Sequence, residues 1–191
     1  MVADMSYSTV SDVLDSWERI RRIPNYDEKT GILLFKKWVL VVAVVLSFLF
    51  SLSFLISHPY FASPQPTNNR MFELEPAAKV IFGFKENMKS EDLLKSNRFS
   101  KHAKYFIQMI DKALGMLGPD IELLTEILMD LGKKHVQYGV KPEYFPSMGR
   151  ALVYAVEELL PEEEFSRQVK DAWVEVYGAL SYDMIRAQKA K

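Results

Sequence analysis

The chain of 191 residues contains no cysteine and only eight glycines. Without cysteine it has no disulfide framework, no thiolate metal site, no iron–sulfur cluster and no cysteine nucleophile. Glycine is scarce and neither G-x-G-x-x-G nor G-K-[ST] occurs, so the chain lacks a phosphate-cradling loop. No segment alternates apolar and polar residues as a β-strand does. These absences exclude several classes of enzyme and favour an all-α protein.

The chain also lacks an excess of either charge, because 24 Lys and Arg face 25 Asp and Glu. This balance gives no electrostatic reason to expect a nucleic acid or an anionic membrane as partner. The acidic cluster 162–164 lies at the start of a predicted helix, where the helix dipole favours negative charge, so it gives no support for a hydrolase. With 49% hydrophobic residues, the chain is not disordered throughout.

Apolar residues recur at intervals of three and four along most of the chain. We therefore expect six to eight helices in one domain. The pattern predicts a helix near the start that Pro24 ends, one over 27–35 with Asp27 as its N-cap, one over 97–115, one over about 120–135, one from Pro142 to Leu160, and one from Phe165 to about Ala187.

One long apolar run stands apart from this pattern. Residues 38–57 carry no charge and have the length of a helix that crosses a bilayer, about 20 residues. The run begins too far from the N-terminus for an ordinary signal peptide. Residues 58–70 contain three prolines and predict a loop. Taken alone, residues 38–57 predict a transmembrane segment.

Three histidines are the natural candidates for metal binding or acid–base chemistry. His58 lies in the predicted loop and is interpreted as an inert surface residue. His102 and His135 each lie one helical turn from an apolar residue, Phe106 and Leu131. A single such histidine is most often a core residue bound to a carbonyl or water. Two imidazoles on the inward faces of two helices, with aromatic side chains around them, are compatible with an iron site in a flat macrocycle.

Short strings around these histidines carry a resemblance. They are LEPAAKVIFGF (74–84), FSKHAKYFIQMIDKAL (99–114), LGKKHVQYGVKPEYF (131–145) and AWVEVYGAL (172–180). In order and spacing they resemble the globin family, most closely its neuroglobin and cytoglobin branch. The resemblance covers nearly all of 8–37 and 71–187. It implies the three-over-three helical sandwich, with 1–37 and 71–191 forming one globin domain interrupted by 38–70.

The resemblance implies roles for particular side chains. His135 matches the proximal histidine that binds haem iron. His102 matches the distal histidine, which either ligates the iron or hydrogen-bonds the bound gas. The residues that match the lining of the haem pocket are Phe82, Phe35, Phe106, Leu131, Val140 and Phe145. Phe106 is bulkier than the valine common at its position, which predicts a crowded distal pocket. Lys104, Lys133 and Lys134 are interpreted as solvated lysines rather than as partners of the haem propionates.

The resemblance further implies haem b (iron protoporphyrin IX) as cofactor and reversible binding of oxygen or another diatomic gas. It favours six-coordinate iron with both histidines bound, and oxygen storage, sensing or nitric oxide chemistry as the role. It implies no dedicated enzyme, and leaves open a secondary nitric oxide dioxygenase, nitrite reductase or peroxidase activity. We expect diatomic gases and an unidentified reductant as partners, no nucleic acid, and a cytoplasmic location.

Two alternatives stay open. One is a membrane-anchored helical protein whose functional element is 38–57, in which case a membrane is also a partner. The other is a helical interaction module that keeps the fold without haem. If residues 38–57 spanned a bilayer, the helices before this run and the helices after it would lie on opposite sides of the membrane. They could not then share one core.

The composition of 38–70 suggests a different origin for this segment. Most residues of 46–66 are Leu, Ser, Phe or Pro, which have codons that begin with two pyrimidines, as in the translated tract before a 3′ splice site. The codons of Lys37, Trp38 and Val39 can form a splice donor, and the Arg70 codon can supply an acceptor AG. Removing 38–70 leaves an ordinary globin length. We hypothesise that 38–70 is translated intron sequence.

Overall fold

The structure is a computed structural model of the chain, and it describes residues 5–35, 71–88, 92, 96–118 and 120–189. Within these ranges it contains α-helices and a 3-10 helix and no strand, which confirms the predicted all-α class. The elements are α1 (Tyr7–Arg21), α2 (Tyr26–Phe35), α4 (Met71–Leu74), the 3-10 helix η2 (Pro76–Phe82), α6 (Asn97–Gly115), α7 (Ile121–Gln137), α8 (Tyr144–Leu159) and α9 (Arg167–Lys189).

Two predicted helix starts were wrong by a few residues. The helix expected to begin at Pro142 begins at Tyr144, because the carbonyls of Lys141 and Pro142 first accept turn hydrogen bonds from the N–H groups of Tyr144 and Phe145. The last helix begins after Ser166 rather than at Phe165. The hydroxyl of Ser166 accepts from the N–H of Val169 (3.2 Å), which caps the helix there.

Asp27 is not the N-cap of its helix, since α2 already begins at Tyr26. Its carboxylate still accepts from the backbone N–H of Glu28 (2.9 Å). It also accepts from the Gln108 side chain (3.1 Å) and pairs with Lys104 (3.4 Å), both on α6. The residue predicted to cap α2 therefore also ties that helix to α6.

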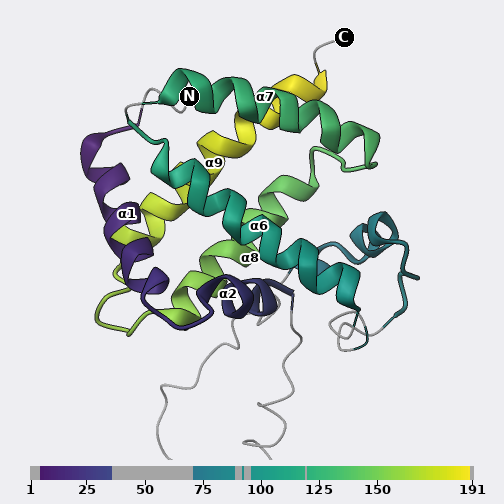
Figure 1. The fold of residues 1–191 in the computed structure, drawn as a ribbon, viewed down its shortest axis with the longest axis horizontal. Helices are drawn as coiled ribbons and strands as arrows, with labels where there is room; N and C mark the ends of the chain where they lie inside the picture. Colours follow the sequence, from purple (N-terminus) through teal and green to yellow (C-terminus); the bar gives the residue numbers. More distant parts are fainter. Residues whose placement is uncertain (1–4, 36–70, 89–91, 93–95, 119, 190–191) are drawn as a thin grey trace, which may run out of the picture.

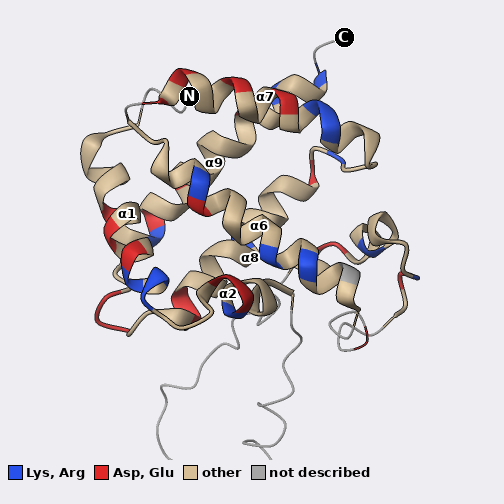
Figure 2. Cartoon of the chain, in the orientation of Figure 1, with Lys and Arg blue, Asp and Glu red and all other residues tan. Residues whose placement is uncertain are grey.

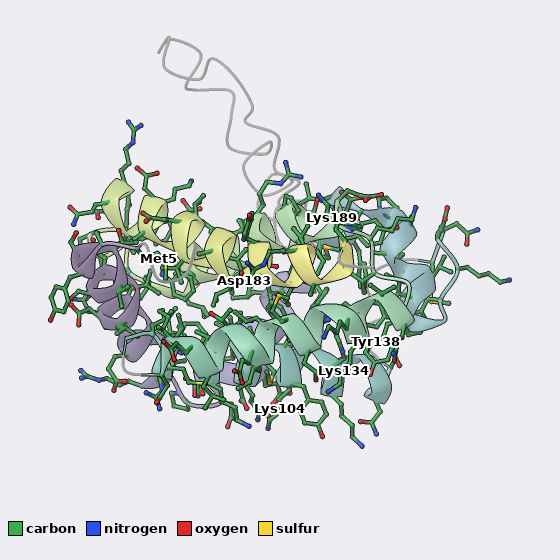
Figure 3. The ribbon with its side chains drawn as sticks, turned by 90° about the horizontal axis from the view of Figure 1, so that it is seen from above. Met5, Lys104, Lys134, Tyr138, Asp183 and Lys189 are labelled. Carbon is green, nitrogen blue, oxygen red and sulfur yellow. The ribbon has the colours of Figure 1, made fainter. Side chains whose placement is uncertain are left out.

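The helices form two groups that face each other. Helices α6 and α7 lie on one side of the molecule, and α8 and α9 lie on the other (Figures 1 and 3). Helix α7 packs along α9, α2 packs against α6 and α8, and α1 packs against α9. This is the arrangement expected of a three-over-three helical sandwich. It places the helices that carry His102 and His135, α6 and α7, on the same side.

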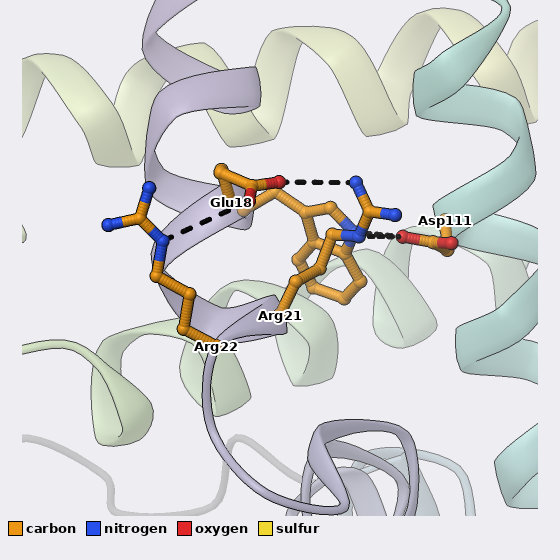
Figure 4. Close-up of polar contacts among 5 residues, drawn as sticks. Glu18, Arg21, Arg22 and Asp111 are labelled. Carbon is orange, nitrogen blue, oxygen red and sulfur yellow. Dashed lines mark hydrogen bonds and ion pairs between the residues drawn. The ribbon is translucent and has the colours of Figure 1, made fainter.

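Buried tryptophans join α1 to its neighbours. The Trp17 and Trp173 rings lie edge to face with centroids 5.5 Å apart. A buried indole N–H needs an acceptor; Trp173 donates to the Ser16 hydroxyl (2.9 Å), and Trp17 donates to Asp111 on α6 (2.8 Å). Arg21 binds the same carboxylate of Asp111 (3.1 Å), as Figure 4 shows. These contacts fix α1 against both α6 and α9.

A glycine sets the distance between α7 and α9. A Cβ atom at Gly132 would overlap the backbone carbonyl of Met184 on α9. Only glycine lets the two helices approach this closely. Because His135 lies one turn after Gly132 on the same helix, this contact also sets the position of His135.

No helix in the described part of the chain is both long and apolar enough to cross a bilayer. The predicted transmembrane run, 38–57, lies outside the described residues.

Candidate functional site

The half-buried side chain of His135 is fixed by its own helix. Its Nδ1 atom lies 2.7 Å from the carbonyl oxygen of Leu131, one turn earlier. Because a carbonyl oxygen can only accept, Nδ1 carries the proton and Nε2 keeps its lone pair. The backbone of His135 is also held, since its carbonyl accepts from the N–H of Val140 (3.0 Å). The imidazole is therefore oriented and has one nitrogen available for a metal.

Three predicted residues contact His135: Phe145 through its ring, and Leu131 and Val140 through their backbones. The Phe145 ring, on α8, lies 5.8 Å from the imidazole centroid and is buried. Leu131 and Val140 are half-buried and pack on the hydrophobic core. The structure thus brings the Phe145 ring to His135, while Leu131 and Val140 meet His135 through backbone hydrogen bonds.

His102 lies on α6 among protein atoms and still borders solvent. Desolvation of its imidazolium form, and to a lesser extent repulsion from His135, lower the pKa of His102 below its ordinary value. The ring is therefore neutral at neutral pH, the form that can bind iron.

Four phenylalanines form a cluster behind His102, which we name the distal aromatic cluster: Phe35, Phe72, Phe82 and Phe99. The Phe82 ring contacts the His102 ring edge-on, with centroids 4.8 Å apart. Phe82 also contacts Phe72 (5.6 Å) and Phe99 (5.5 Å), and Phe35 packs on Phe72 (5.2 Å) and Phe99 (4.8 Å). Phe72 and Phe99 each contact both Phe35 and Phe82. Phe35 therefore lies further from His102 than Phe82 does, on the other side of these two rings.

Sequence reasoning missed three residues near the site: Phe72, Phe99 as a site residue, and Lys79. Phe99 could have been found, since it lies one turn before His102 on the same helix. Phe72 follows directly after the apolar insertion, where no continuous periodicity exists to place it. Lys79 is a buried lysine, which composition and periodicity do not predict for a charged side chain. Phe106, the predicted neighbour of His102, is half-buried on α6.

The donor set of the site fits haem iron better than a free metal ion. Within the described residues, no group of three or more His, Asp or Glu side chains could hold a metal. Two imidazoles alone leave most coordination positions of an iron ion unfilled, whereas a porphyrin fills four and leaves two axial positions. The half-buried apolar side chains of Phe82, Phe106, Leu131 and Val140 offer the kind of surface that a flat apolar macrocycle covers.

Lysines lie at the solvent edge of both histidine helices. Figure 2 shows Lys and Arg along α6 and at the C-terminal end of α7, and Figure 3 shows Lys104, Lys134 and Tyr138 on one edge of the molecule. Lys104 pairs with Asp27 (3.4 Å) and Lys134 with Asp130 (2.7 Å). Each of these two ammonium groups thus pairs with a nearby surface carboxylate, as expected of a solvated lysine.

Comparison with known proteins finds similarity to globins. The model of the globin family, described as Globin, matches residues 68–184. Neuroglobin of Tetraodon nigroviridis is 32% identical over 119 residues, covering 62% of this chain and 74% of that protein. Neuroglobin-2 of Oncorhynchus mykiss is 33% identical over 110 residues, covering 57% of this chain and 68% of that protein.

Solved structures share the fold at low identity. A hexacoordinated heme protein from an anhydrobiotic tardigrade superposes with a TM-score of 0.69 at 15% identity, covering 98% of this chain and 97% of that one. A globin of Drosophila melanogaster superposes with a TM-score of 0.66 at 15% identity, covering 95% and 94% of the two chains.

Proposed function

The chain belongs to the globin family, and we propose that it binds haem b between His102 and His135 and takes up oxygen or another diatomic gas at the iron. One observation carries this proposal. The His135 imidazole is oriented with Nε2 available and lies beside the Phe145 ring, while the His102 imidazole of a separate helix lies against the Phe82 ring.

Each residue of the site has a distinct task. Haem iron supplies the position at which a diatomic gas binds reversibly. His135 holds the iron through Nε2, while its bond to Leu131 keeps the ring from rotating. Phe82 and Phe145 exclude water from the two faces of the site, which protects ferrous iron from oxidation. The distal His102 either binds the iron or donates a hydrogen bond to the gas.

We propose six-coordinate iron, with His102 in the sixth position when no gas is present. An external gas then competes with an intramolecular ligand. Its apparent affinity falls in proportion to the fraction of molecules in which His102 is away from the iron. The exposure of His102 to solvent supports this exchange.

Absorption spectra test the proposal directly. The purified chain is mixed with hemin, and spectra are taken in the ferric form, the ferrous form and the ferrous form with carbon monoxide. We expect a sharp Soret band that shifts when carbon monoxide is added. A chain that stays colourless after hemin is removed from solution has no haem site, and the helical interaction module then becomes the better description.

We propose that gas binding, rather than turnover of a substrate, is the main role, with an unidentified reductant that keeps the iron ferrous and a cytoplasmic location. Rates of nitric oxide consumption, nitrite reduction and peroxide turnover by the haem-loaded chain, measured against free hemin, test the first point. Cell fractionation tests the second, because a membrane-anchored protein would sediment with the membranes.

We further propose that the globin domain consists of 1–37 and 71–191. The Phe35 and Phe72 rings are 5.2 Å apart although the two residues are 37 residues apart in the sequence. With 38–70 removed, Phe35 and Phe72 would be four residues apart, and residues at that separation on a helix are neighbours at about 5–6 Å. Phe35 and Phe72 thus lie where a continuous helix would place them, which supports the proposal that 38–70 is dispensable.

A further inference from the structure

Lys79 is a buried lysine close to the distal side of the site. It lies in η2, one turn before Phe82, and only 8% of its surface is exposed. Its ammonium donates to the carbonyl oxygens of Glu86 (3.1 Å) and Met88 (2.8 Å). A buried ammonium must be hydrogen-bonded because it has lost its water. Here its two observed partners are backbone carbonyls of the following loop.

The backbone of Lys79 holds the same loop from the other side. Its carbonyl accepts from the N–H of Phe84 (3.2 Å). Between them Gly83 adopts a left-handed conformation (φ 78°), which ends η2 directly after Phe82 and suits glycine. Lys79 therefore binds residues 84–88 through both its carbonyl and its ammonium, and we name these residues the clamped loop.

The clamped loop borders the distal aromatic cluster. Phe84 packs against Phe99, with ring centroids 6.5 Å apart, and Met88 packs on the core. Phe82, which precedes the loop, is the ring that contacts His102. The ring of Phe82 therefore links the residue that directly precedes Gly83 and the clamped loop to His102.

We propose that Lys79 is a positioning residue that fixes Phe82 against His102 and so limits how readily His102 moves away from the iron. This proposal rests on the haem function proposed above. Without the ammonium, the carbonyls of Glu86 and Met88 lose their donor and the loop opens more often. Phe82 then constrains His102 less, and an external gas reaches the iron faster.

The test substitutes Lys79 by Met, whose unbranched apolar side chain fills a similar volume but donates no hydrogen bond. Lys85→Met is the matched control, because Lys85 is an exposed lysine of the same loop. Lys79→Arg keeps the charge and the donors and serves as the rescue. In the haem-free full chain, we expect amide hydrogen exchange of 84–88 to quicken about tenfold in Lys79→Met and to change little in the other two.

In the haem-loaded chain, we expect the rate of carbon monoxide binding to ferrous iron to rise about threefold in Lys79→Met, and to stay near the unsubstituted value in Lys85→Met and Lys79→Arg. Faster exchange with unchanged carbon monoxide kinetics would overturn the positioning role and leave Lys79 a loop anchor. Unchanged exchange would overturn the clamp itself.

Should Lys79→Met fail to fold, Lys79→Gln, which keeps a shorter donor, is measured in the same way. An unsubstituted chain that binds no haem defeats the proposed function, whereas the exchange experiment still decides the clamp.

Discussion

The Nδ1 atom of His135 lies 2.7 Å from the carbonyl oxygen of Leu131, and this one hydrogen bond fixes both the tautomer and the orientation of the imidazole. The same helix therefore positions the histidine in space and selects which of its nitrogens can bind iron.

Replacing His135 with alanine removes the imidazole whose Nε2 is available to bind iron. We expect the variant to lose stable haem incorporation, which the Soret absorbance of the purified, hemin-treated protein measures. His58→Ala is the control, since the sequence predicts His58 to be an inert loop residue. A His135→Ala protein with an unchanged Soret band would refute the assignment.

Replacing His102 with leucine keeps an apolar side chain of similar size but removes the sixth ligand. We expect the ferrous, gas-free spectrum to change from low-spin six-coordinate to five-coordinate. Lys101→Leu introduces the same side chain one residue earlier, where it points away from the ring's position on the helix, and should leave the spectrum unchanged. A spectrum that remains low-spin in His102→Leu would mean that another residue supplies the sixth ligand.

Replacing Gly132 with alanine forces α7 away from α9, because the new Cβ overlaps the Met184 carbonyl. We expect the free energy of unfolding to fall by about 2 kcal/mol, the usual cost of overpacking, and haem affinity to fall with it as His135 shifts. Gly178→Ala on α9 is the matched control. No atom lies within 4 Å of the Cβ it would add, so helix propensity should raise stability by about 0.5 kcal/mol. Urea denaturation measures both, and equal effects of the two substitutions would contradict the close contact.

Deleting 38–70, which joins Lys37 to Met71, should leave the fold and the haem spectra unchanged. The Phe35 and Phe72 rings already lie in contact, so the shortened chain needs no rearrangement of the distal aromatic cluster. Removing a long insertion also lowers the entropy cost of closing the chain, by about 0.6 kcal/mol for each halving of its length. The melting temperature should therefore stay the same or rise, and a deleted chain that fails to fold would show that the segment belongs to the domain. Sequencing the transcript across this junction gives an independent answer.

Replacing Asp27 with asparagine should weaken the α2–α6 contact in a pH-dependent way. Burial alone would raise the pKa of Asp27, but the hydrogen bonds from Gln108 and the Glu28 N–H, together with Lys104, lower it below its ordinary value. The ionised group therefore stabilises the fold at neutral pH, and this contribution is lost as pH falls below the ordinary carboxyl range. We expect Asp27→Asn to cost about 1 kcal/mol at neutral pH and to show a smaller loss of stability in acid.

Asp130→Asn is the control for this effect, because Asp130 pairs with Lys134 on the exposed surface of α7. Exposed ion pairs are screened by water and contribute little. Urea denaturation at neutral and acidic pH measures both variants. If Asp27→Asn loses stability in acid as steeply as the unsubstituted chain, Asp27 is not the group responsible.

Local pattern was enough to predict most of the fold. The helix over 97–115 was predicted with the bounds it has in the structure, because its apolar residues are evenly spaced and no proline interrupts them. The starts of α8 and α9 were misplaced because turn and cap hydrogen bonds at Lys141, Pro142 and Ser166 decide them, and periodicity does not report such bonds. The predicted site residues stay predictions as to their roles, although the structure places the Phe145 ring beside His135.

The sequence by itself determined the all-α class, the two candidate histidines and the family resemblance, since these depend on residue types at short spacings along a helix. Only the tertiary structure decided that Phe72 and Phe99 stand behind Phe82, that Gly132 lets α7 approach α9, and that Lys79 binds the loop after Phe82. These relationships join residues across helices or across an insertion. Their energies come from close packing and buried hydrogen bonds, which no local periodicity encodes.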